Sequence, residues 1–163
     1  MFLRMTITLL ACSAASLAVA SPGHSDNGSS DGKTSTFAGR AGQIESVDRV
    51  VQVKASDQMR FNSNDWAFRP GETIRFVVTN TGQIPHELVI DTIDGHASHR
   101  ETMMQAMASG GMMEHNDPNA VSVAPGETDE LVWTFSETGT FEAACNIPGH
   151  YQAGMRASID VVN

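Results

Sequence analysis

Residues 139–155 have the sequence GTFEAACNIPGHYQAGM. The alternating segment that ends at Cys145 predicts a strand with the thiol on its apolar face. Pro148 and the glycine after it favour a turn, and the loop that follows carries His150. Met155 opens a second alternating segment. The stretch therefore predicts two strands whose connecting loop gathers a thiol, an imidazole and a thioether.

Alternation of apolar with polar residues predicts further strands, and Pro-Gly turns precede two of them. The predicted strands cover residues 47–55, 73–78, 86–91, 120–123, 131–135, 140–145 and 155–162. Seven or so antiparallel strands with polar turns are typical of a Greek-key β-sandwich or barrel. We therefore predict an all-β fold in a single domain over residues 45–163.

The donor atoms in and near this loop are those that copper prefers. His86 begins the predicted strand 86–91, in phase with Leu88, so its side chain points to the apolar face. Two imidazoles and a thiolate, with a weakly bound methionine, form the trigonal type 1 copper site. Taken singly, His86, Cys145, His150 and Met155 are each explained as core or turn residues. Taken together, they predict one bound copper ion.

The N-terminal residues predict export. Residues 1–20 contain Arg4, an apolar stretch and the small-x-small end Ala18-Val19-Ala20, which is typical of a cleaved signal peptide. We expect a periplasmic protein. A lipoprotein acylated at Cys12 is the less favoured alternative, because its apolar core would be too short. Cleavage removes Cys12 and leaves Cys145 unable to form an intramolecular disulfide.

The composition limits the other partners. Residues 21–44 are rich in small polar residues and predict a flexible leader. The formal net charge of −9 argues against binding to nucleic acid. No second apolar segment is long enough for membrane insertion. We expect a monomer whose partners are copper ions and a redox protein that the sequence does not identify.

One segment between two predicted strands has no place in a minimal copper carrier. Residues 94–119 include a predicted helix over 98–108. The segment is rich in soft donors, namely His96, His99, Met103, Met104, Met107, Met112, Met113 and His115. Two alternatives stay open: the methionines pack on the sandwich, or the segment forms a second site for Cu(I), which thioethers and imidazoles favour.

The motifs Asn80-Thr-Gly-Gln-Ile-Pro-His86 and Cys145 through Met155 resemble those of the cupredoxin family, which includes plastocyanin, azurin and auracyanin. The resemblance covers about residues 45–163. It implies an eight-stranded Greek-key sandwich with copper at one end, held by His86, Cys145, His150 and Met155. The spacers around His150 are most similar to those of auracyanin, and residues 112–120 resemble exported bacterial cupredoxins associated with copper tolerance. Glu87 departs from the asparagine that azurin and plastocyanin carry beside the first histidine.

These observations predict an exported type 1 copper protein with one-electron redox activity, serving copper tolerance or homeostasis. The alternative is a dedicated periplasmic electron-transfer carrier, which would not need the segment 94–119. We expect no enzymatic activity. The chain has 6 histidines and no His-x-His pair, too few for a trinuclear copper cluster. A methionine ligand is too soft for a zinc hydrolase, and no nucleophile motif is present.

Overall fold

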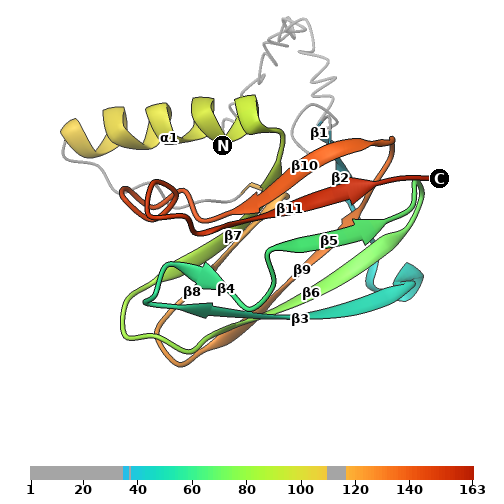
Figure 1. Ribbon diagram of the computed structural model, residues 1–163, viewed down its shortest axis with the longest axis horizontal. Helices are drawn as coiled ribbons and strands as arrows, with labels where there is room; N and C mark the ends of the chain where they lie inside the picture. The colour runs from blue at the N-terminus through green and yellow to red at the C-terminus, as the bar shows by residue number, and fades with distance from the viewer. Residues whose placement is uncertain (1–34, 37, 110–116) are drawn as a thin grey trace, which may run out of the picture.

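The computed structural model describes residues 35, 36, 38–109 and 117–163. Two β-sheets stack face to face, and one helix lies outside them beside the loop between the last two strands (Figure 1). One sheet has the strand order β1-β2-β9-β6-β3-β4 and the other has the order β5-β11-β10-β7-β8. The predicted Greek-key-type sandwich with a helical insertion is confirmed.

The elements follow the alternation of the sequence closely. Their bounds are β1 Ser35–Thr36, β2 Gly39–Ala41, a 3-10 turn Ile44–Ser46, β3 Arg49–Ser56, β4 Arg60–Phe61, β5 Asp65–Phe68, β6 Thr73–Asn80, β7 His86–Asp91, α1 Ile93–Ala108, β8 Ala120–Val123, β9 Thr128–Thr134, β10 Gly139–Ala144 and β11 Arg156–Val161. Strands β7 and β8 have the predicted bounds. The short strands β4 and β5 were not predicted, because a few residues show no clear period.

The prediction that all strands pair antiparallel is wrong for two pairs. Strand β3 runs parallel to β6, and β11 runs parallel to β5. Between β3 and β6 the chain crosses to the other sheet to form β5, so it returns to β6 in the direction of β3. Alternation shows which side chains are buried but not which strand lies next to which.

The core lies between the sheets and uses the predicted faces. Ile74, Phe76 and Val78 of β6 and Trp133 of β9 are fully buried. The Phe68 ring stacks on Phe135 with centroids 4.9 Å apart. Burial of these aromatic and branched side chains is the main favourable contribution to folding. The sandwich therefore gives a rigid frame from whose end the strand-terminal side chains project.

Helix α1 begins earlier than predicted, at Ile93 instead of residue 98. The Thr92 hydroxyl accepts a hydrogen bond from the Gly95 N–H at 3.0 Å and so caps the helix. His96, in the second turn, is fully buried. The extra turns are therefore stabilised by a cap and by tertiary contacts.

Ordered structure also begins before residue 45. Strand β2 lies inside the range predicted as a leader and pairs with β9. Ala38 is fully buried, and its carbonyl accepts a hydrogen bond from the Trp133 indole N–H at 3.3 Å. The predicted signal peptide, residues 1–20, lies outside the described residues. Within the described residues, no helix has both the length and the apolar character needed to cross a membrane.

Candidate metal centre

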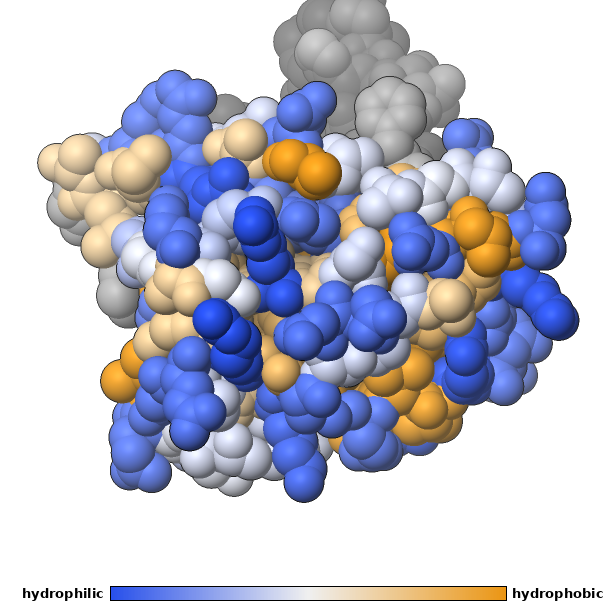
Figure 2. All heavy atoms as spheres, viewed as in Figure 1, coloured by the Kyte–Doolittle hydropathy of each residue, from blue (hydrophilic) through white to orange (hydrophobic). Residues whose placement is uncertain are grey.

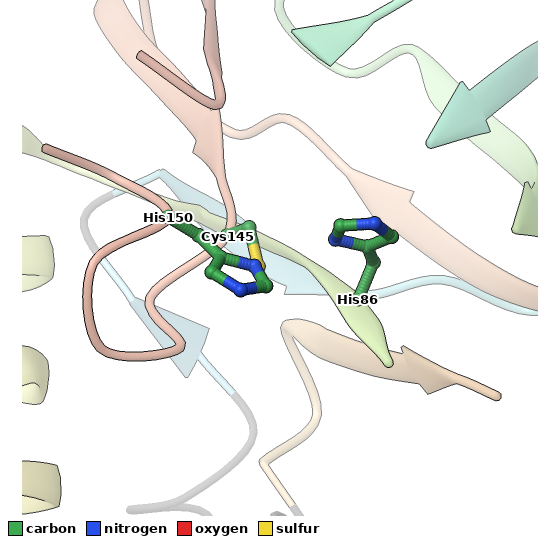
Figure 3. Close-up of side chains that lie close together, drawn as sticks. All are labelled: His86, Cys145 and His150. Carbon is green, nitrogen blue, oxygen red and sulfur yellow. The ribbon is translucent and has the colours of Figure 1, made fainter. Parts of the chain in front are cut away.

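Three potential metal ligands meet at one end of the sandwich. His86 is the first residue of β7, Cys145 directly follows β10, and His150 lies on the loop between β10 and β11 (Figure 3). One donor atom from each lies within 4.8 Å of the others. The Cys145 Sγ is 3.3 Å from the His150 Nδ1. The structure thus brings His86 next to Cys145 and His150, which lie in a distant part of the sequence.

The imidazole of His86 is held with one nitrogen facing the other two side chains. It is fully buried, and its Nε2 lies 3.2 Å from the Asp57 Oδ1. Its Nδ1 is buried and has no hydrogen-bond partner among the described residues. A buried polar atom without a partner is costly. A metal ion bound to Nδ1 would remove that cost, so this side chain fits a ligand.

The thiol of Cys145 is also suited to a metal. Burial raises its pKa to about 12, and the nearby Glu87 carboxylate adds to the rise, whereas the backbone N–H groups of Glu87 and Ile147 lower it. The thiol is therefore protonated at neutral pH when no cation is near. The thiolate is the form that binds metals, and soft sulfur ligands favour soft metal ions such as Cu(I).

The ligand loop is closed by its own backbone hydrogen bonds. The Cys145 N–H donates to the Met155 carbonyl at 3.0 Å, and the Met155 N–H donates to the His150 carbonyl at 3.0 Å. Gly149 and Gly154 have backbone φ angles of 91° and 98°, values that residues with a side chain rarely adopt. Met155 is fully buried. The loop thus holds cysteine, histidine and methionine in fixed relative positions.

Glu87 connects the first histidine to the ligand loop. Its side chain is 2% exposed, and its Oε1 accepts a hydrogen bond from the Asn146 N–H at 2.6 Å. Strand β7 is thereby tied to the residue after Cys145. The sequence marked Glu87 as a departure from the related proteins, and the structure shows that its carboxylate makes the connection between the two ligand segments.

Helix α1 packs against the outer side of the same loop. The buried His96 places its Nδ1 3.1 Å from the Asn146 amide and its Nε2 3.1 Å from the Glu142 carbonyl. The Arg100 guanidinium lies 3.7 Å from the centre of the Tyr151 ring. The hydroxyl of Tyr151 donates to Glu142 at 2.7 Å. These contacts join the helix to the residues that flank the metal ligands.

The residues predicted for a second Cu(I) site fall into different environments. Both ring nitrogens of His96 are engaged, and burial lowers its pKa. Met103 is 9% exposed and packs inward, as the packing alternative expects. His99 Nδ1 lies 4.0 Å from the Asp117 carboxylate. Met104 and Met107 are 57% and 56% exposed. Met112, Met113 and His115 lie outside the described residues.

Apolar side chains gather over the end of α1 in the space-filling view (Figure 2). The exposed methionines Met104 and Met107 belong to this helix. Sequence reasoning missed two other residues at the centre. Asp57 contacts His86 from a turn 29 positions earlier, and the Arg60 guanidinium donates to the Ala153 carbonyl of the ligand loop at 2.7 Å. Neither has a signal in the sequence, because both contacts depend on how the β3–β4 turn folds against distant segments.

A two-sheet sandwich with two histidines, a cysteine and a buried methionine at one end defines the class of small type 1 copper proteins. Residues 47–162 match the family described as copper binding proteins, plastocyanin/azurin family. The chain belongs to this family, which confirms the cupredoxin class expected from the sequence.

Individual relatives agree with this assignment. The chain is 41% identical to the copper-resistant cuproprotein CopI of Rubrivivax gelatinosus, over 98% of this chain and 96% of that protein. It is 35% identical to the copper-resistant cuproprotein CopI of Pseudomonas aeruginosa, over 76% of this chain and 81% of that protein. Among solved structures, auracyanin B matches with a TM-score of 0.62 and 20% identity, over 77% of this chain and 97% of auracyanin. The last comparison concerns the fold alone.

Proposed function

We propose that this protein holds one copper ion through His86, Cys145, His150 and Met155 and serves copper tolerance outside the cytoplasm. The observation that carries the metal assignment is the convergence of three donor atoms within 4.8 Å, together with the unpartnered His86 Nδ1. Similarity to the copper-resistant cuproproteins CopI supports the tolerance role.

Each proposed ligand has a distinct task. The Cys145 thiolate and the two imidazole nitrogens are the strong donors, and the Met155 thioether is the weak axial one. Burial and the nearby His86 lower the pKa of His150, which favours the neutral imidazole that a metal requires. Copper bound there would supply one-electron oxidation and reduction. The half-buried His150 lies beside the exposed Pro148, at the position from which an electron would reach a partner.

Copper sensitivity in cells tests the proposed function. A strain that lacks the gene should grow poorly at raised copper, and the wild-type gene should restore growth, whereas the Cys145→Ser gene should not. Mass spectrometry of the exported protein should show cleavage after Ala20, as the predicted signal peptide requires. Unchanged copper tolerance, with a defect confined to respiration or another redox pathway, would favour the dedicated electron carrier instead.

We also propose that the exposed thioethers of α1 bind additional Cu(I). Met104 and Met107 project from the helix, and a solvent-facing methionine contributes little to packing. Soft thioether ligands select Cu(I). His96 is not part of this proposal, because its ring nitrogens hold the ligand loop.

Replacing Met104 and Met107 together with leucine should remove a colourless second equivalent of Cu(I) and leave the type 1 absorption unchanged. Because the swap conserves volume at exposed positions, stability should change by less than about 0.5 kcal/mol. Equilibrium dialysis against Cu(I) measures the stoichiometry, and Met103→Leu, at a buried position, is the matched control. A single copper per wild-type chain, unchanged in the double variant, would restore the packing alternative.

A further inference from the structure

The buried histidine of the metal centre is held by a carboxylate from a distant turn. Asp57 lies between β3 and β4, and its Oδ1 is 3.2 Å from the His86 Nε2. A carboxylate oxygen accepts hydrogen bonds, so this contact places the imidazole proton on the Nε2. The lone pair of the imidazole is then on Nδ1, the buried nitrogen that has no hydrogen-bond partner among the described residues.

The loop between β6 and β7 holds this carboxylate in position. The second oxygen of Asp57 accepts a hydrogen bond from the Gln83 N–H at 2.7 Å. A Cβ on Gly82 would lie 1.9 Å from the Asp57 Oδ1, so the absence of a side chain there leaves the space that the carboxylate fills. The Gly82 N–H itself donates to the Asn80 side chain at 2.8 Å. The loop that contains Gly82 and Gln83 therefore has both the space and the hydrogen-bond donor that the Asp57 carboxylate needs.

We propose that Asp57 is a positioning residue of the copper centre, which fixes His86 in the Nε2–H tautomer and shifts the metal's preference toward its oxidised state. The proposal rests on the proposed function, because it presumes copper at the Nδ1 of His86. A carboxylate bonded to a ligating imidazole fixes the ring and makes the other nitrogen a stronger donor. A stronger nitrogen donor with a negative charge behind it stabilises Cu(II) more than Cu(I).

Three substitutions separate orientation from charge. Asp57→Ala removes both hydrogen bonds and the charge. Asp57→Asn keeps one acceptor oxygen for the His86 N–H and loses the charge. Gly82→Ala keeps the aspartate in the sequence but puts a methyl group where its carboxylate oxygen lies, so the carboxylate must move away. Asp160→Asn is the matched control, since it removes the same charge from an exposed carboxylate toward the far end of β11.

The first measurement uses the metal-free protein. Long-range proton–nitrogen spectra of the imidazoles should show His86 as a single Nε2–H tautomer in the wild type, in Asp57→Asn and in Asp160→Asn. Asp57→Ala and Gly82→Ala should show a mixture of the two tautomers. A single unchanged tautomer in Asp57→Ala would overturn the orienting role.

The second measurement is the reduction potential of the copper-loaded protein. Loss of the carboxylate should weaken Cu(II) binding about tenfold relative to Cu(I), within the 10–100-fold range of such outer contacts. That ratio raises the potential of a one-electron couple by about 59 mV. Asp57→Ala, Asp57→Asn and Gly82→Ala should all shift upward, whereas Asp160→Asn should stay at the wild-type value.

Equal reduction potentials in the three variants and the wild type would overturn the proposed effect of Asp57 on the copper ion. An equal shift in Asp160→Asn would also overturn it, because the change would then follow net charge alone. Failure of the wild type to bind copper with a type 1 absorption band would instead refute the proposed function, and the tautomer spectra of the metal-free protein would still decide how Asp57 orients His86.

Discussion

Cys145→Ser should yield a folded protein that has lost the intense visible absorption of its copper form. The band arises from charge transfer between the thiolate sulfur and copper, and a hydroxyl does not replace the sulfur in that transition. Serine is close to cysteine in size, and the N–H groups of Glu87 and Ile147 that face the sulfur can donate to the new oxygen. The unfolding free energy of the metal-free protein should therefore fall by only about 1 kcal/mol.

Absorption spectroscopy with copper quantitation measures this result, and circular dichroism checks the fold. Met155→Leu is the matched control, because it removes the other sulfur of the proposed site from an equally buried position. It should keep the copper and the intense band, with a higher reduction potential, since the axial thioether is a weak ligand that tunes the metal. Persistence of the band in Cys145→Ser would remove Cys145 from the ligand set.

Asn80→Ala should destabilise the metal-free protein by about 3 kcal/mol, because it leaves several backbone groups unpaired. The fully buried amide of Asn80 donates to the carbonyls of Ile84 and Val123 at 2.8 and 3.0 Å, and its oxygen accepts from the Gly82 N–H at 2.8 Å. These bonds shape the loop that leads to His86. Loss of copper affinity should therefore accompany the loss of stability.

Urea unfolding of the metal-free protein measures the change. Thr79→Ala is the control on the same strand: its hydroxyl pairs with Thr128 at 2.9 Å on the exposed face, and its removal should cost less than about 0.5 kcal/mol. A similar small loss in Asn80→Ala would show that the 81–85 loop is stabilised by other contacts.

Most of the strands were predictable because their signal is local. The alternation in residues 73–78 and 131–135 corresponds to β6 and β9, and the buried side chains are those on the predicted face. The phase of Cys145 and Met155 likewise placed both sulfurs in the interior. Strand β5 and the early start of α1 were missed, since a four-residue strand has too few repeats and the first turns of α1 depend on the Thr92 cap and on contacts of His96.

The sequence by itself determined the donor set, the sandwich class and the order of the two ligand segments, because residue type and alternation are properties of neighbouring positions. Only the tertiary structure decided that β3 and β11 have parallel partners, that Glu87 holds Asn146 and that Asp57 reaches His86. Each of these contacts joins segments far apart in the chain. Their formation depends on strand register and on the fold of turns, which the local pattern of apolar and polar residues does not encode.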